Sequence, residues 1–198
     1  MMKKFLKSLI FCIVMIFVAG CASSPTSRFY TLSSTSVPDG KPHGNYAVSV
    51  GPVSVPAVVD RPQIVLRTGP NKVFIDEFDR WASPLKDNIQ RVIVENLMAT
   101  LGTTQITMFP RSIPSDGSYR TVINILHFDS EPGKATTLDA LWEVSLPGQG
   151  PLRRGRTTVT EPLESGGFDA LVAAHSRALG QLSAEIAGAI RELEARNP

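Results

Sequence analysis

Residues 83–102 of the sequence read SPLKDNIQRVIVENLMATLG, and this stretch has the clearest periodicity in the chain. Its apolar residues recur at intervals of three and four, the spacing that places side chains on one face of an α-helix. They are Leu85, Ile89, Val92, Ile93, Leu97 and Leu101. Ser83 is a suitable N-cap, Pro84 suits the first helical position and Gly102 suits a left-handed C-terminal cap. The pattern predicts a helix over residues 84–101 that packs through this stripe.

A second helix is predicted over residues 168–193, where apolar residues recur with the same spacing and alanines raise the helix propensity. Elsewhere, short runs of β-branched and aromatic residues between turn-forming residues predict strands. The predicted strands span residues 28–32, 46–55, 64–67, 73–75, 105–109, 119–128, 136–146 and 153–160.

Some of these strands carry information about their place in a sheet. Gly51-Pro52 interrupts the strand 46–55, which indicates an edge strand or a bulge. The strand 119–128 is apolar on both faces, as a central strand would be, whereas 153–160 is polar enough for an edge. Residues 69–72 are typical of a hairpin turn. The acidic stretch 76–79 is interpreted as a solvated turn that leads into the first helix.

The order of the elements (strands, helix, strands, helix) predicts a single α+β domain in which two long helices cover one face of a largely antiparallel sheet. We expect this domain at residues 45–198. A segment rich in Ser, Thr, Pro and Gly, residues 21–44, precedes it and is interpreted as a lipidated flexible tether with one short strand. Residues 1–20 are interpreted as a signal peptide that is removed.

The N-terminus has the layout of a secretory signal. Lys3, Lys4 and Lys7 precede an apolar run over residues 9–19. This run is shorter than the about 20 apolar residues that cross a bilayer. A transmembrane anchor is therefore the weaker interpretation.

The end of this signal, Val18-Ala19-Gly20-Cys21, resembles the lipobox of bacterial lipoproteins. The resemblance implies cleavage between Gly20 and Cys21 and attachment of a diacylglyceryl group to the Cys21 thiol, followed by acylation (palmitate, for example) of the new N-terminus. Stable anchoring takes two acyl chains or more. Ala22 stands where an aspartate would retain such a lipoprotein at the inner membrane, so it favours the outer membrane, facing the periplasm. The alternative is an unprocessed signal with a chance cysteine.

Removal of the signal changes the charge and the cysteine count. Three of the 20 Lys and Arg residues leave with it, so 17 remain against 18 Asp and Glu. A near-neutral domain without a basic run gives no support for nucleic-acid binding. Cys12 leaves with the signal and Cys21 accepts lipid, so no cysteine is left for a disulfide. We expect core burial alone to stabilise the domain.

The sequence has no recognisable catalytic or cofactor-binding pattern. No metal-ligand spacing links His43, His127 and His175, and no phosphate-binding glycine loop is present. His175 is interpreted as a packed or partly exposed helix residue. We expect no catalytic residue, no metal and no cofactor, and therefore a protein that is not an enzyme.

Segments along nearly the whole mature chain are similar, in order and spacing, to those of the ABC-type transport auxiliary lipoproteins. The similar segments are residues 28–32, 53–56, 59–65, 80–85, 88–89, 96–97 and 174–179, with Leu138, Ala140 and Trp142.

This resemblance implies a non-catalytic subunit of an MCE-type, Pqi-like envelope lipid-transport system. Such a subunit would be anchored in the outer membrane by its acyl chains, would dock the MCE-domain protein that spans the periplasm, and would support membrane integrity. A homo-oligomeric ring of several copies is compatible with this role. One alternative is a periplasmic carrier that holds lipid in an apolar cavity between sheet and helices. A less favoured alternative is an envelope hydrolase, which needs polar groups that converge in a cleft.

Asp60, Arg61, Pro62, Arg80 and Trp81 are the candidate partner contacts, or structural signatures, within the similar segments. Asp60-Arg61-Pro62 is typical of a stiffened turn in which Asp60 pairs with a nearby arginine. Trp81 has two interpretations, of which the first is favoured. It closes the end of the core in the manner of a hydrophobic staple, or it contacts a partner, because Trp and Arg are frequent in binding hot spots.

Overall fold

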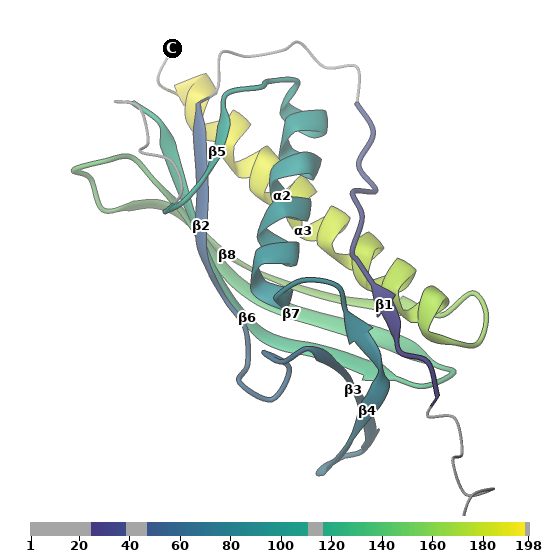
Figure 1. Cartoon of the computed structure of the whole chain (residues 1–198). Helices are drawn as coiled ribbons and strands as arrows, with labels where there is room; N and C mark the ends of the chain where they lie inside the picture. Colours follow the sequence, from purple (N-terminus) through teal and green to yellow (C-terminus); the bar gives the residue numbers. More distant parts are fainter. Residues whose placement is uncertain (1–24, 39–46, 111–116, 197–198) are drawn as a thin grey trace, which may run out of the picture.

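The computed structural model describes residues 25–38, 47–110 and 117–196 (Figure 1). They form one α+β domain, as the order of the predicted elements indicated. In chain order the elements are β1 (Arg28–Tyr30), β2 (Val48–Ser54), β3 (Gln63–Gly69), β4 (Lys72–Trp81), α2 (Leu85–Leu101), β5 (Ile106–Met108), β6 (Tyr119–Glu131), β7 (Ala135–Ser145), β8 (Pro151–Pro162) and α3 (Phe168–Arg196). Within the described ranges, no helix has the length and apolar character needed to span a membrane.

The larger sheet has five strands in the order β5-β2-β6-β7-β8. β6, β7 and β8 pair antiparallel, whereas β2 runs parallel to both β5 and β6. β6 is a central strand and β8 is an edge strand, which confirms the predictions from their polarity. The two helices lie side by side on one face of this sheet, α2 against β2 and β5, and α3 against β7 and β8 (Figure 1).

A smaller sheet is formed by three strands in the order β1-β4-β3. β3 and β4 make the predicted hairpin, with Gly69 opposite Lys72 at its turn. β1 pairs parallel with β4, with Arg28 opposite Asp79 and Tyr30 opposite Trp81. The sequence pattern predicts these strands individually but does not show that they form a sheet of their own.

β4 is longer than predicted, because it continues through the acidic stretch that was expected to be a solvated turn. The Asp76 carboxylate accepts hydrogen bonds from the backbone N–H groups of Phe78 and Asp79, both at 2.9 Å, and bends the strand there without ending it. Asp79 is only 1% exposed. The expectation of a solvated turn is wrong because Arg28 and Tyr30 supply hydrogen-bond partners for this carboxylate inside the fold.

The two ends of α2 differ in how well the sequence predicts them. The Ser83 cap is wrong: Pro84 is the N-cap, it makes no side-chain cap, and its carbonyl accepts the N–H groups of Asp87 and Asn88 at 3.1 and 3.0 Å. The predicted C-terminal cap is confirmed. Gly102 is in the left-handed region, with φ 66°, and its N–H donates to the Met98 carbonyl.

The interruption of β2 at Gly51-Pro52 is a bulge, because the register with β6 shifts between Val50 and Val53. Gly51 has a φ of 115°, and the Gln90 side chain of α2 lies against it. The Gln90 amide donates to the carbonyls of Val50 and Phe109 at 2.8 and 2.7 Å. A Cβ at position 51 would lie 2.6 Å from the Gln90 amide nitrogen, so both backbone and space require glycine.

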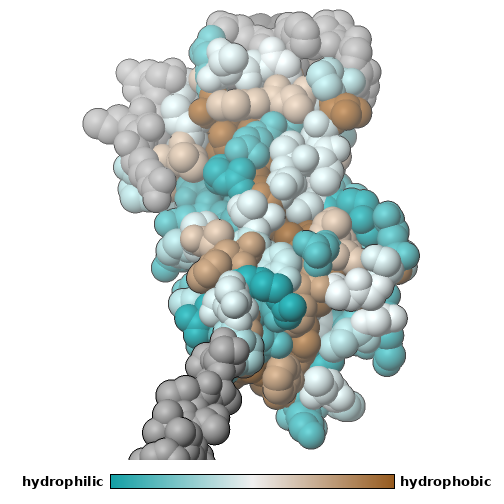
Figure 2. Space-filling view, turned by 45° about the vertical axis from the view of Figure 1, so that its right-hand side comes forward, coloured by the Kyte–Doolittle hydropathy of each residue, from teal (hydrophilic) through white to brown (hydrophobic). Residues whose placement is uncertain are grey.

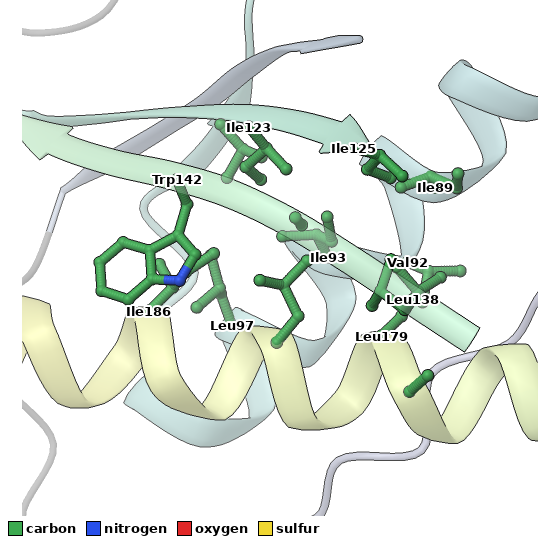
Figure 3. Close-up of a cluster of buried hydrophobic side chains, with 14 of the residues drawn as sticks. Ile89, Val92, Ile93, Leu97, Ile123, Ile125, Leu138, Trp142, Leu179 and Ile186 are labelled. Carbon is green, nitrogen blue, oxygen red and sulfur yellow. The ribbon is translucent and has the colours of Figure 1, made fainter. Parts of the chain in front are cut away.

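Buried side chains from both helices and from the central strands fill the space between the layers (Figure 3). The labelled members are Ile89, Val92, Ile93 and Leu97 of α2, Leu179 and Ile186 of α3, Ile123 and Ile125 of β6, and Leu138 and Trp142 of β7. All are less than a tenth exposed. The stripes predicted for the two helices therefore face each other and the sheet.

His175 is part of this interior and has no exposed surface. Its Nε2 lies 2.8 Å from the Ser130 hydroxyl, and its ring stacks on Phe128 with centroids 3.8 Å apart. Burial lowers the pKa of His175 to about 3, so the ring is neutral at neutral pH. This agrees with the packed interpretation of His175.

Candidate functional site

A cleft lies where the turn after β2 meets the end of β4 and the start of α2. The backbone N–H of Trp81 donates to the Pro62 carbonyl at 2.7 Å and joins the two segments. The cleft has a volume of about 320 Å³. Its lining residues are Asp60, Arg61, Pro62, Trp81, Ala82, Ser83, Pro84 and Leu85. Four of the five candidate contact residues thus come together from segments about twenty positions apart.

The first wall of the cleft is a tight turn. The Pro56 carbonyl accepts the N–H groups of Val59 and Asp60 at 3.0 and 3.1 Å, and Val59 is buried in the core. Among the residues that the structure describes, Asp60 pairs with a lysine and not with an arginine: its carboxylate lies 3.8 Å from Nζ of Lys86, on the first turn of α2. Both side chains are well exposed, so this ion pair contributes little stability.

Arg61 has the least satisfied side chain of the cleft. Its Nε is buried and has no hydrogen-bond partner among the residues that the structure describes. A buried donor without a partner costs free energy, of the order of 1–3 kcal/mol.

Trp81 lines the cleft, but most of its side chain is packed in the core. Its side chain is 6% exposed and packs against Phe128, with ring centroids 6.4 Å apart. This agrees with the interpretation in which Trp81 closes the end of the core. Arg80 points elsewhere, since its Nε donates to the Glu77 carbonyl at 2.8 Å, and it does not line the cleft.

Behind the cleft, a buried carboxylate attaches β1 to β4. Asp79 accepts hydrogen bonds from Arg28, at 2.7 and 2.5 Å, and from the Tyr30 hydroxyl at 2.8 Å. The Arg28 hydrogen bonds hold the pKa of Asp79 below its usual value, and the same pair raises the pKa of Arg28. Burial, with the hydrogen bond to Asp79, raises the pKa of Tyr30 to about 12. The first strand of the domain, β1, is therefore attached through the buried carboxylate of Asp79, which is ionised.

The chain after β1, residues 31–38, runs without regular secondary structure along the two helices, and we call it the N-terminal strap (Figure 1). Leu32 is fully buried. The fully buried Asn96 of α2 accepts the N–H groups of Thr35 and Ser36 at 3.1 and 3.2 Å. Ser176 of α3 accepts the Ser33 N–H at 3.2 Å. The strap is thus held by polar residues of both helices.

These strap contacts were not predicted as functional positions. Asn88 and Asn96 lie beside the apolar stripe of α2, and both are at most 1% exposed. Buried asparagines need partners, and Asn88 receives hydrogen bonds from Thr31 and Arg91 at 3.3 and 2.8 Å. The sequence could have indicated these contacts. Two asparagines, eight residues apart, lie beside the apolar stripe of a predicted helix, on the side that must be buried.

The lipidation residues lie outside the described residues. Gly20, Cys21 and Ala22 belong to the range 1–24, so their assignment remains a prediction from sequence. Across the ranges that are described, no group of three or more His, Cys, Asp or Glu side chains could hold a metal ion.

The fold and the cleft together define the class of protein. It is a single α+β domain that includes its N-terminal strap and has a cleft at the start of α2. A sequence profile described as the ABC-type transport auxiliary lipoprotein component matches residues 30–187. The chain belongs to this family, and it is an auxiliary lipoprotein component of transport. Both the cleft and the strap lie inside the matched range.

Two solved structures are similar to the domain. One is the crystal structure of an uncharacterized protein, with a TM-score of 0.69 and 23% identity over 84% of this chain and 99% of that chain. The other is the crystal structure of a protein from Xanthomonas campestris, with a TM-score of 0.73 and 21% identity over 87% of this chain and 100% of that chain. Both likenesses establish the fold. Comparison with curated proteins yields no match.

Proposed function

We propose that this lipoprotein is the outer-membrane-anchored subunit of an MCE-type envelope lipid-transport system. In this role it docks the periplasm-spanning MCE-domain protein and supports membrane integrity. Within its family the chain most resembles PqiC, in residues 59–65 and 80–85 above all, which favours a Pqi-like system. The acylated Cys21 is the anchor, and Ala22 directs the protein to the outer membrane.

The observation that carries the docking proposal is the convergence of these two segments on one cleft. Asp60 and Arg61 lie on its first wall, and the start of α2 forms the other. The guanidinium of Arg61 in this lining favours a partner that brings a carboxylate or carbonyl oxygen. Since Trp81 is already used by the core, we propose that the polar wall, and not the indole, contacts the partner.

We also propose that the protein is not an enzyme. His175 and Ser176 are adjacent in sequence, but each has another structural partner. The His175 ring binds Ser130, and the Ser176 hydroxyl donates to the Val172 carbonyl at 2.9 Å. This arrangement supports a structural role for both residues.

The filled interior supports docking over the alternative of a lipid carrier. A carrier needs an apolar cavity between sheet and helices, and that space is occupied by the side chains of Figure 3. The cleft is on the surface and not in the interior, and Asp60 and Arg61 are among its lining residues.

The test is affinity purification of the lipidated protein from cell envelopes, with the partners identified by mass spectrometry. We expect wild type to recover an MCE-domain protein and Arg61→Glu to lose it. Arg154→Glu is the matched control, because Arg154 is an exposed arginine of β8 outside the cleft. Recovery of no MCE-domain protein by the wild type would contradict the proposed function. Equal recovery by all three proteins would contradict the assignment of the cleft.

A further inference from the structure

An exposed apolar surface covers the β3–β4 hairpin and its neighbour β1. Val73, Phe74 and Phe78 of β4 are 40, 52 and 39% exposed, and Phe29 of β1 is 64% exposed. Figure 2 shows apolar surface at the lower end of the molecule, where this hairpin lies. Apolar residues that cluster in this way, among polar neighbours, mark sites that contact a membrane or another protein.

The position of the hairpin relative to the N-terminus indicates whether this apolar surface contacts a membrane or another protein. β1 and β4 run parallel, with Arg28 beside Asp79, so both strands come from the lower end of the domain (Figure 1). Cys21 is seven positions before Arg28, and Lys72 at the hairpin end is seven positions before Asp79. At about 3.3 Å per extended residue, both lengths are about 23 Å. The acylated cysteine can therefore reach the level of the hairpin tip but not far beyond it.

The surroundings of the tip also suit a lipid surface. Lys72 is exposed at the end of the hairpin, and Lys134 is exposed in the β6–β7 turn. This turn and the hairpin tip line one shallow cleft, so they lie at the same end of the domain. Phenylalanines buried at the headgroup boundary beside lysines that meet lipid phosphates are typical of proteins that lie on a membrane.

We propose that the tip of the β3–β4 hairpin rests on the membrane, with Val73 and Phe74, the exposed apolar residues next to the turn, inserted at the boundary between headgroups and acyl chains. This inference rests on the proposed acylation of Cys21 and adds a second, non-covalent contact to it. It also fixes the orientation of the domain. β4 spans ten residues, so the cleft at Trp81 is held about 30 Å from the lipid surface, where a periplasmic partner can reach it.

The test uses the full-length lipidated protein in vesicles of phosphatidylethanolamine and phosphatidylglycerol, with and without bromine on the acyl chains. Val73→Trp and Phe74→Trp each place an indole at the proposed contact. The native indoles, Trp81 and Trp142, are buried, and the wild-type signal corrects for them. The matched control is Leu141→Trp, since Leu141 is 42% exposed on β7 in the other sheet.

We expect brominated lipid to quench the emission of Val73→Trp and Phe74→Trp, with a blue shift on vesicle binding, and to leave Leu141→Trp unchanged. If the protein is vesicle-bound and neither hairpin variant is quenched, the hairpin contact is wrong and the acyl anchor stands. A blue shift without quenching that grows with protein concentration would assign the surface to a second copy and would overturn the proposal. A mature protein without acyl chains, by mass, would overturn the anchor and this inference with it.

Discussion

The carboxylate of Asp79 binds the guanidinium of Arg28 through two hydrogen bonds, of 2.7 and 2.5 Å, across the parallel pair β1–β4. Arg28 is mostly exposed, whereas Asp79 is almost fully buried. The attachment of the N-terminal segment therefore depends on a carboxylate that is kept ionised inside the protein by a partner at its surface.

The first prediction concerns acid stability. Because the folded pKa of Asp79 is lowered, its stabilising contribution is complete above the unfolded value of about 3.9 and is lost as pH falls from there through the folded pKa. We expect Asp79→Asn to be less stable than wild type at pH 7 and to lose less stability on acidification below about pH 4. Urea unfolding followed by circular dichroism at several pH values measures this. Asp60→Asn, at an exposed ion pair, is the control. If the unfolding free energies of Asp79→Asn and wild type change with pH in the same way, Asp79 is not responsible for the loss of stability in acid.

A second pH effect should come from His175 in a higher range. Its pKa is about 3 in the folded protein, against about 6.5 in an unfolded chain. The contribution of the neutral ring to the unfolding free energy is therefore complete above about pH 6.5 and declines as pH falls toward 3. We expect wild type to lose unfolding free energy between pH 7 and pH 5, and His175→Gln, which retains a polar group near Ser130, to lose less. Denaturant midpoints at the two pH values measure the difference. An equal loss in both proteins would show that His175 is not the titrating group.

The strap gives a prediction for Asn96. Asn96→Ala removes the acceptor for the N–H groups of Thr35 and Ser36 and leaves them close to the helices without that partner. We expect a loss of about 2–3 kcal/mol of unfolding free energy, and faster hydrogen exchange at these two amides. Asn124→Ala is the control, since Asn124 is exposed and should change stability by less than about 0.5 kcal/mol. Unchanged exchange at Thr35 and Ser36 would refute this account of the strap.

Gly155 of β8 lies under the ring of Trp142, and a Cβ there would lie 2.2 Å from Cζ2 of the indole. We expect Gly155→Ala to cost about 1–3 kcal/mol, because the ring must move away from its hydrogen bond to Thr157. Gly150→Ala, where a Cβ would meet nothing, is the matched control. Thermal unfolding of both variants measures the difference, and equal melting temperatures would contradict it.

Trp81 should matter for folding more than for partner binding. Its buried ring packs on Phe128, so Trp81→Ala should cost about 3–5 kcal/mol of unfolding free energy. Trp81→Phe retains most of the packing and should recover the partner at the wild-type level. Loss of the partner by a stable Trp81→Phe protein would instead assign the indole to the interface.

The helices and most strands could be predicted because their signals are local. The stripes of α2 and α3, the left-handed Gly102 and the hairpin turn at residues 69–72 each depend on residues within a few positions of one another. The N-cap of α2 was predicted one residue too early. Ser83 was expected to cap the helix, but Pro84 has an extended backbone and is itself the N-cap. Such errors move an element boundary by one residue.

The smaller sheet and the cleft could not be predicted, because they depend on contacts between distant parts of the chain. Arg28 and Asp79 are separated by 51 positions, and nothing near Asp79 in the sequence indicates that a cation will neutralise it. The same holds for Asn96 and the strap, 60 positions or more apart. The family resemblance marked both residue ranges that form the cleft, but it is the contacts of the folded chain, such as the Trp81–Pro62 hydrogen bond and the pairing of Gln63 with Arg80, that show that they are neighbours.

The parallel pairing of β1 with β4 has a mechanical consequence. A force that pulls the N-terminal segment out of the domain acts along β1, so it loads the β1–β4 hydrogen bonds and the Arg28–Asp79 pair together in shear. Shear divides the tension among all of these bonds, whereas peeling would break them one after another. Beyond them the strap, through its hydrogen bonds to Asn96 and Ser176, carries the remaining load into both helices. A domain attached in this way can resist traction between its N-terminus and a partner without local unfolding.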